Sequence, residues 1–290
     1  MQRILVPLDG SALSEAIIPV AEALVRDYEA ELILVRAVRP RGSDVLEPET
    51  EMAKEAEAYL SRKAKELQAR GLAGVRWSVW YGRPEQAIAD AAAKDRVDLV
   101  AMTTHGRGGL GRLLLGSVAE SLVRQSPAPV LLIRGLPSWR PGEIRRILVA
   151  LDGSEVSEAI LPVVERLAGP FDFAIDLLHV VEPMPSPAMA EVSTRLEEST
   201  ELRRADSEEY LSKVAGALEA KGLRVRQAVR VGLAVDKIQE YAREEGIGLI
   251  AMTTHGRTGL GRLFFGSVAE RVVRTAPVPV LLWKAREDGG

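Results

Sequence analysis

A glycine-rich stretch occurs twice in this chain and contains the residue types that could do chemistry. It runs from Met102 to Glu120 and returns almost unchanged from Met252 to Glu270. Each copy follows a short apolar run and leads into a helical pattern, which is typical of a strand, a loop and a helix start. Glycines let backbone N–H groups approach an anion closely, and the unpaired N–H groups at a helix start favour negative charge. The spacing therefore favours a phosphate-binding loop in each copy.

The charged and polar side chains of the loop fit the same chemistry. Arg107 and Arg257 belong to sets of arginines that outnumber the single glutamate of each copy, although the net charge of the chain is −3. These arginines are either phosphate ligands or solvated surface residues, because charged side chains are usually exposed. His105 and His255 lie in the same loops. They are either neutral histidines that bond the backbone or catalytic bases.

A second interpretation of the loops needs no ligand. Ser117 and Glu120 have the spacing of a capping box, and so do Ser267 and Glu270. In a capping box, serine and glutamate satisfy the free backbone donors at the start of a helix, and the glycines would then only turn the chain. The coincidence of glycines, a helix start and arginines in both copies favours the phosphate interpretation.

Composition restricts the class of protein. With 290 residues, of which 47% are hydrophobic and 27% charged, the chain is long enough for two soluble domains. The sequence has no apolar run of membrane-spanning length and begins with a strand pattern in place of a signal peptide, so we expect a cytoplasmic protein. The absence of cysteine excludes disulfides and thiolate metal sites, and three scattered histidines are too few for a histidine metal cluster. The mildly acidic charge balance argues against nucleic-acid binding.

The whole chain is a tandem duplication. The sequence from Arg3 to Ser11 recurs with one change from Arg146 to Ser154, and the glycine-rich stretches also recur in the second half. A short segment with proline and glycine, residues 135–142, has the composition of a linker. We therefore predict two domains, residues 1–136 and 143–290.

Each half alternates apolar runs of strand length with amphipathic helical patterns. The alternation predicts an α/β fold in which each domain is a doubly wound, five-stranded parallel sheet with four helices. In the second half, a longer segment rich in proline and methionine, residues 182–194, is predicted to be a loop. The predicted strands are residues 3–8, 31–38, 75–80, 99–103 and 129–133 in the first half, and segments near Ile147, Asp176, Val225, Leu249 and Pro279 in the second.

An aspartate follows the first strand of each half. A doubly wound sheet binds its ligand beyond the carboxyl ends of the strands, where the strand order reverses, and Asp9 and Asp152 fall there together with the glycine loops. The carboxylates could cap the following helix as part of an Asp-Gly-Ser turn. Alternatively, they could face a Mg²⁺ ion that accompanies phosphates.

The residues of the two loops resemble the universal stress protein family, and the resemblance covers essentially the whole chain as two fused domains. Nucleotide-binding members of that family carry glycine, two residues, glycine, nine residues, and then glycine with serine or threonine. Gly106, Gly116 and Ser117 match this pattern in the first half. Gly256, Gly266 and Ser267 match it in the second. The first glycine of the pattern is absent, and Thr103 and Thr253 take its place beside the expected ribose.

The resemblance implies a strand order of 3-2-1-4-5 and one adenine nucleotide, ATP with or without Mg²⁺, in each domain. Asp9 and Asp152 would lie beside the ribose, the phosphates and the nucleotide-bound metal. The backbone of Ala37 and Val180 would contact adenine. The implied site residues are Pro7, Asp9, Ala37, Met102, Thr103, His105, Gly106, Arg107, Gly116, Ser117 and Val118 in the first domain, and Ala150, Asp152, Val180, Met252, Thr253, His255, Gly256, Arg257, Gly266, Ser267 and Val268 in the second.

Three functions are compatible with these residues. The resemblance implies an ATP-binding regulatory module of the stress response with slow or no hydrolysis. An ATPase or nucleotidyl transferase is the second, although the loops have no Gly-Lys-Ser/Thr motif. A nucleotide-free interaction scaffold is the third. We also expect the two halves to pair through the edge strands at residues 129–133 and 279–283, while further association of whole chains stays open.

Overall fold

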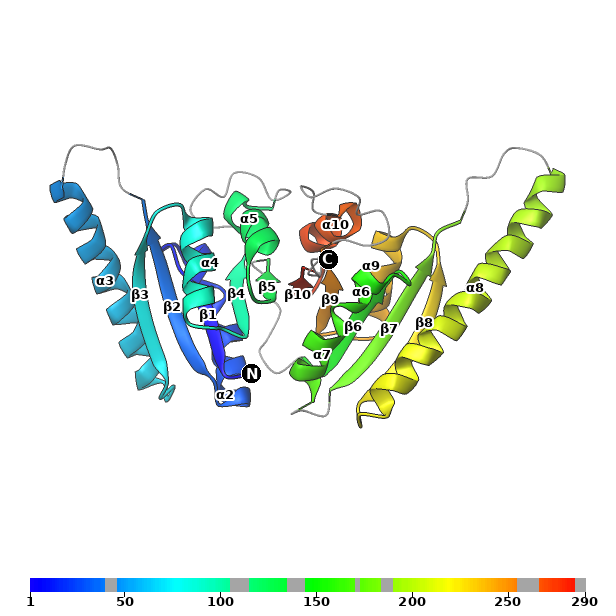
Figure 1. The fold of residues 1–290 in the computed structure, drawn as a ribbon, viewed down its shortest axis with the longest axis horizontal. Coiled ribbons are helices and arrows are strands. Elements are labelled where there is room, and N and C mark those ends of the chain that lie inside the picture. The colour runs from blue at the N-terminus through cyan, green and yellow to red at the C-terminus, as the bar shows by residue number, and fades with distance from the viewer. Residues whose placement is uncertain are drawn as a thin grey trace, which may run out of the picture. The chain divides into compact units, whose positions relative to one another are not determined.

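The computed structural model describes residues 1–39, 46–104, 115–134, 144–169, 173–183, 190–254 and 266–284. The chain divides into two compact units, Met1–Glu143 and Ile144–Gly290 (Figure 1). Each unit is built from alternating strands and helices, so the predicted α/β class is confirmed. No helix in the described ranges is long and apolar enough to cross a membrane.

The elements of the two units follow the same order. The first unit contains β1 (Arg3–Pro7), α1 (Ala12–Glu15), α2 (Ile18–Tyr28), β2 (Glu31–Val38), α3 (Leu46–Ala69), β3 (Val75–Tyr81), α4 (Pro84–Lys94), β4 (Leu99–Thr103), α5 (Ser117–Gln125) and β5 (Val130–Ile133). The second contains β6 (Arg146–Leu151), α6 (Glu155–Glu158), α7 (Leu161–Ala168), β7 (Ala174–Val181), α8 (Ala190–Glu219), β8 (Arg224–Val231), α9 (Ala234–Glu244), β9 (Leu249–Thr253), α10 (Ser267–Thr275) and β10 (Val280–Trp283).

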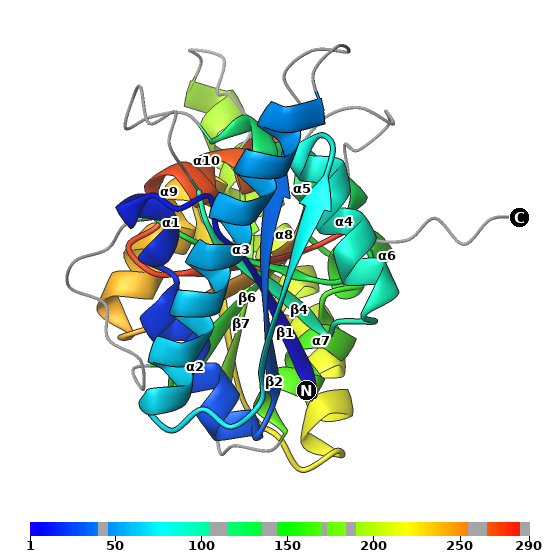
Figure 2. The same cartoon turned by 90° about the vertical axis from the view of Figure 1, so that its left-hand side faces the viewer.

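Each unit forms the predicted doubly wound sheet. The strand order is β3-β2-β1-β4-β5 in the first unit and β8-β7-β6-β9-β10 in the second, and the strand pairs within each unit are parallel. Since parallel crossovers are right-handed, a reversal of strand order places α2 and α3 on one face of the first sheet and α4 and α5 on the other (Figure 2). The central strands are apolar because both faces are covered, and β4 is buried along its whole length.

Two predictions about the helices are wrong. The four helices predicted for each half include one helix after the first strand, but the structure has two short helices there, α1 and α2. A continuous helix would need a bond from the N–H of residue 19 to the Glu15 carbonyl, and Pro19 has no N–H. Pro162 has the same position in the second unit and separates α6 from α7. The loop predicted for residues 182–194 is shorter, because α8 begins at Ala190. Residues 184–189 lie outside the described part of the chain.

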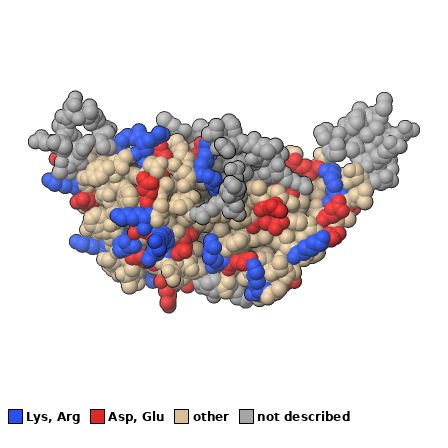
Figure 3. All heavy atoms as spheres, in the orientation of Figure 1, with Lys and Arg blue, Asp and Glu red and all other residues tan. Residues whose placement is uncertain are grey.

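Charges of both signs are mixed on the surface. On the face shown in Figure 3, acidic and basic side chains alternate over the described parts of both units. Several charged side chains of the described residues form ion pairs within their own helix, such as Arg204 with Glu208 and Lys213 with Glu209. Such exposed pairs contribute little stability and mark the solvated faces of the helices.

Candidate functional site

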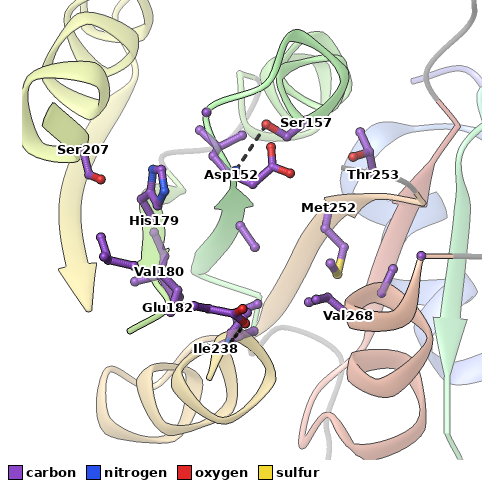
Figure 4. Close-up of a pocket in the computed structure, with 18 of the residues that line it drawn as sticks. Asp152, Ser157, His179, Val180, Glu182, Ser207, Ile238, Met252, Thr253 and Val268 are labelled. Atoms are coloured by element: carbon purple, nitrogen blue, oxygen red, sulfur yellow. Dashed lines mark hydrogen bonds between the residues drawn. The ribbon is translucent and has the colours of Figure 1, made fainter. Parts of the chain in front are cut away.

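A cavity of about 710 Å³ opens at the carboxyl ends of β6, β7 and β9 in the second unit (Figure 4). Its other walls come from α8, α9 and the first turn of α10. The chain leaves β6 toward β7 on one side, while β9 lies on the other side, so the cavity lies where the strand order reverses. This is the position expected for the ligand crevice of a doubly wound sheet.

The site residues predicted for the second domain come together around this cavity. Those within the described ranges all line it, and they come from three strand ends and one helix start. The lining residues among the predictions are Ala150, Asp152, Val180, Met252, Thr253, Gly266, Ser267 and Val268. His255, Gly256 and Arg257 lie outside the described residues, so their predicted roles stay predictions.

The predicted residues of the first domain occupy the equivalent positions of its sheet. β1 pairs with β2 on one side and with β4 on the other, so their carboxyl ends meet at one edge. Pro7, Ala37, Met102 and Thr103 lie at these strand ends, Asp9 follows β1, and Gly116, Ser117 and Val118 form the start of α5. His105, Gly106 and Arg107 lie outside the described residues.

The aspartate after the first strand forms a tight turn in both domains. Asp9 Oδ1 accepts the Ser11 backbone N–H at 2.8 Å, and Asp152 Oδ1 accepts the Ser154 backbone N–H at 3.0 Å. The helix caps are the serines, whose hydroxyls accept from the backbone N–H three residues further along, at 3.1 Å in both domains. The interpretation of the aspartates as helix caps is therefore wrong. Each turn holds its carboxylate in a fixed orientation at the strand end.

The alternative interpretation, a capping box at the start of α5 and of α10, is also wrong. The N-caps of α5 and α10 are Gly116 and Gly266, and neither helix has a side-chain cap. Glu120 forms an ion pair with Arg124 one turn further along, and Glu270 does the same with Arg274 at 3.5 Å. The glutamates thus point along the helix and do not reach back to its first residue.

The first turn of α10 therefore presents backbone donors to the cavity. Ser267, Val268 and Ala269 line the cavity, and their N–H groups belong to the first turn, which has no intrahelical acceptors. Gly266 itself is anchored, because its N–H donates to the Thr254 carbonyl at 2.8 Å. Uncapped donors combined with the helix dipole favour a bound anion at this position.

The cavity has an apolar and a polar side. Figure 4 shows Ile238, Met252 and Val268 toward one side, with Glu182 beside Ile238, and Asp152, Ser157 and Thr253 toward the other. A ligand that fills this space would place a flat apolar group beside α9 and polar groups beside the end of β6. Its charged end would meet the start of α10.

The wall formed by α8 was not predicted from the sequence. Arg203, Asp206, Ser207 and Tyr210 of α8 line the cavity together with His179 of β7. Ser207 is buried on the helix stripe that otherwise carries apolar residues, and a polar residue on such a stripe is the signal that could have identified this wall. Burial, followed by the charge of Glu158, raises the pKa of Tyr210, so its hydroxyl stays protonated at neutral pH.

Glu182 joins three elements at the mouth of the cavity. Its carboxylate Oε1 accepts the backbone N–H of Ala234, the first residue of α9, at 3.1 Å. Its carbonyl oxygen accepts from Arg203 Nη1 of α8 at 3.0 Å. In the first domain Pro84 replaces Ala234 and has no N–H to donate, so this connection belongs to the second domain.

Comparison with known proteins agrees with this architecture. The sequence profile of the universal stress protein family matches residues 1–134 and, a second time, residues 143–284. A universal stress protein of Methanocaldococcus jannaschii is 35% identical over 141 residues, which are 48% of this chain and 82% of the relative. A universal stress protein of Mycolicibacterium smegmatis is 26% identical over 298 residues and covers 98% of this chain and 97% of its own length.

A solved structure shows the same fold over the full length. The crystal structure of a universal stress protein from Archaeoglobus fulgidus superposes with a TM-score of 0.75 and 21% identity, covering 97% of this chain and 98% of its own. At this identity the similarity demonstrates the fold alone. The two profile matches together span nearly all of the sequence, and the chain therefore belongs to the universal stress protein family, with two family domains in tandem.

Proposed function

We propose that each domain binds one adenine nucleotide and that the chain acts as a nucleotide-dependent regulatory module. The observation that carries this proposal is the uncapped start of α10, which opens onto a cavity whose apolar side suits a base. The proposal has three parts: an anion at the helix start, a base held by a strand end, and a metal beside the aspartate.

The phosphate part depends on backbone groups. The N–H groups of Ser267 and Val268 would donate to phosphate oxygens, because glycine at the N-cap offers no competing side-chain acceptor. The start of α5 has the same geometry around Gly116 in the first domain. Arg107 and Arg257 would add positive charge from the glycine loops.

The base part depends on the end of β7. The Gly232 N–H donates to the Val181 carbonyl, so the backbone groups of Val181 point toward β8. Successive residues of a strand point their backbone groups to opposite sides, so the N–H and C=O of Val180 point toward β6. The register of β6 with β7 ends one residue earlier, at the pair Leu151 and His179. The backbone of Val180 would donate to and accept from the edge of adenine, and Ile238 and Met252 would lie along the ring face.

The metal part depends on one carboxylate. In the ranges that the structure describes, no three ligating side chains gather to hold a metal ion. A Mg²⁺ ion beside Asp152 would thus take its remaining oxygen ligands from the nucleotide phosphates and water, as Mg²⁺ commonly does in nucleotide sites. When bound, the ion would neutralise phosphate charge, and Asp152 would hold its position.

An ATPase is the second candidate, and we rank it lower. Fast phosphoryl transfer needs a positioned nucleophile and a group that orients it, in addition to cations on the phosphates. The carboxylate of Asp152 is held by Ser154, from its backbone N–H at 3.0 Å and its hydroxyl at 2.6 Å, which fits a metal-facing group better than a base that activates water. We propose that bound ATP turns over far below about 1 s⁻¹, the lower end for kinases.

Calorimetric titration of the full chain with ATP and Mg²⁺ tests the proposal. We expect two sites with micromolar affinity, about −8 kcal/mol each. Gly266→Val should abolish the second-domain site, because a branched side chain blocks the close approach of phosphate to the helix start. Gly116→Val is the matched variant for the first domain, and the double variant should bind no ATP. Two sites retained in the double variant would contradict the assignment of the helix starts, and no binding to the unmodified chain would leave the scaffold hypothesis.

A further inference from the structure

The cavity of the second domain extends past the predicted nucleotide residues into a lobe against α8. We call this part the α8 lobe, and it is lined by His179, Asp206, Ser207 and Tyr210. Figure 4 shows Ser207 and His179 at the end of the cavity that lies away from Thr253 and Val268. The nucleotide proposed above does not need these residues, so the lobe requires an explanation of its own.

The first domain contains the same strand end and facing helix, which we call the frame. The sequence repeat shows which of its residues correspond. The pairs Pro7–Val35 and Ala150–Leu178 have the same place in the strand register, so the next residues, Arg36 and His179, correspond. The helices α3 and α8 end in the same turn, because the N–H of Leu72 bonds the Leu67 carbonyl and the N–H of Leu223 bonds the Leu218 carbonyl. Counting back equally from these turns pairs Tyr59 with Tyr210, Glu55 with Asp206, and Ala56 with Ser207.

A guanidinium group occupies this frame in the first domain. The guanidinium carbon of Arg36 lies 5.2 Å from the centroid of the Tyr59 ring, within range of a cation–π interaction. Its Nη2 is 3.9 Å from Glu55 Oε1. Arg36 is only 9% exposed, so the cation is nearly enclosed. The Tyr59 hydroxyl donates to Glu15 Oε1 at 2.7 Å, which fixes the ring beneath the guanidinium.

The second domain keeps the acidic and aromatic parts of this frame and has His179 at the register position of Arg36. Tyr210 and Asp206 replace Tyr59 and Glu55, and Glu158 lies close enough to Tyr210 for its charge to act on the hydroxyl. His179 meets the Tyr210 ring edge to face, with centroids 6.0 Å apart and an interplanar angle of 87°. A histidine side chain is shorter than an arginine side chain, and His179, Asp206 and Tyr210 line the open cavity.

The charges around the cavity favour a cation in this region. The described lining includes the carboxylates of Asp152, Glu182 and Asp206 and the single guanidinium of Arg203. Arg203 is engaged by the carbonyl oxygens of Glu182 and Ser199, at 3.0 and 3.3 Å. In the part of the chain that the structure describes, Asp206 has no ion-pair partner.

We propose that the α8 lobe binds the guanidinium group of a small organic cation, in the place that Arg36 occupies in the first domain. A planar guanidinium can stack on Tyr210 while its N–H groups reach the Asp206 carboxylate and the Ser207 hydroxyl. A primary ammonium has the charge without the planar fork, so it should bind more weakly. The site does not depend on the nucleotide proposed above.

Agmatine, which carries a guanidinium at one end, is a suitable probe, with butylamine as the ammonium control. Saturation-transfer NMR on the full chain without nucleotide should detect agmatine binding and weaker butylamine binding. His179→Arg should supply the guanidinium from the protein itself and lower the agmatine affinity at least about tenfold, since it places in the second domain the group that fills the first. Asp206→Asn should weaken agmatine binding by about threefold to tenfold through the loss of the charged acceptor.

The reciprocal variant uses the first domain as its own control. Arg36→His should open a second lobe and raise the number of agmatine molecules bound per chain from one to two, and circular dichroism shows whether this variant is folded. If it is not folded, His179→Arg, which replaces the imidazole on Tyr210 by a guanidinium, and Asp206→Asn decide the question. Absence of agmatine binding to the unmodified chain, or equal binding by His179→Arg, would overturn the proposal. ATP titration of the same samples reports separately on the nucleotide site.

Discussion

The two domains share their fold strand for strand, yet they fill the same interior with different chemistry. In the second domain, Asp176 of β7 is fully buried, and Arg146 of β6 binds it with two parallel hydrogen bonds of 3.0 and 2.6 Å. The Tyr241 hydroxyl donates to the same carboxylate at 3.0 Å. In the first domain the repeat places Ile33 and Ala91 at the positions of Asp176 and Tyr241. The duplicated fold therefore tolerates either an ionic or an apolar interior at this point.

The comparison separates the features that both domains share from those that differ between them. Both domains keep the Asp-Gly-Ser turn, the glycine N-cap of α5 and α10, and the strand order. They differ in the interior of β2 and β7 and in the lobe against α3 and α8. The shared features surround the proposed nucleotide site, while the differing ones lie beside it. We infer that the first group serves the common function and the second group distinguishes the domains.

Removing the arginine of the buried network should have the largest effect on stability. Arg146→Met leaves the Asp176 carboxylate buried without its counter-charge, which should cost about 3–5 kcal/mol in the second domain. The matched variant Arg3→Met should cost less than about 1 kcal/mol, because Arg3 is 41% exposed and contacts Glu31 at 3.6 Å. Urea unfolding with hydrogen exchange would separate the two domains. Equal losses would contradict the assigned difference between the interiors.

Converting the ionic interior to the apolar one should recover most of that loss. The double variant Arg146→Met with Asp176→Ile gives the second domain the isoleucine of the first and removes the buried charge together with its partner. Replacing a whole buried ion pair by apolar groups is often neutral, so the double variant should lie within about 2 kcal/mol of the unmodified chain. If the double variant is less stable than Arg146→Met alone, the ion pair contributes net stability and the comparison must be revised.

Alkaline pH should reveal the contribution of Tyr241 to the stability of the second domain. Burial, followed by the charge of Asp176, raises the pKa of Tyr241 to about 12. The folded state then holds the phenol proton more tightly than the unfolded state, whose pKa is about 10. The resulting stability is present below pH 10 and is lost as the pH rises from about 10 to 12. Tyr241→Phe should reduce the pH slope of unfolding in this window by one proton, measured by urea unfolding at several pH values. An unchanged slope would show that the phenol titrates normally.

The smallest effects should separate true helix caps from the serines at the glycine loops. Ser154 caps α6 through its hydroxyl, so Ser154→Ala should cost about 0.5–2 kcal/mol. Ser267 follows the N-cap of α10 and does not cap it, so Ser267→Ala should change stability by less than about 0.5 kcal/mol. Thermal melting of both variants tests the contrast. A comparable loss in Ser267→Ala would restore the capping-box interpretation.

The strands were predictable because apolar runs alternate with helical patterns, whereas the strand order followed from the resemblance to the universal stress protein family. The bounds of β2 and β4 follow directly from apolar runs such as Leu99–Thr103. The capping box failed because serine and glutamate at this spacing are equally compatible with a glutamate that pairs with Arg124 one turn later. Spacing alone cannot distinguish these two partners of the glutamate.

The part of the site formed by α8 could not be located from the sequence. An amphipathic pattern identifies the buried stripe of a helix, and Ser207, Tyr210 and Leu211 share that stripe. The pattern does not show which end of the stripe extends past the strand ends and therefore lines the cavity instead of the core. The Asp176 network had a visible signal, a charged residue inside an apolar strand, but its partners Arg146 and Tyr241 are distant in the sequence.

Native mass spectrometry of the full chain with ATP and Mg²⁺ tests the central claim most directly, because it counts bound molecules per chain. We predict complexes with one and two ATP molecules, the second species saturating at high ATP. Gly266→Val and Gly116→Val should each stop at one ATP, and the double variant should bind none. A chain that binds no ATP, or a double variant that still binds two, would contradict the claim that each domain holds a nucleotide at the start of α5 or α10.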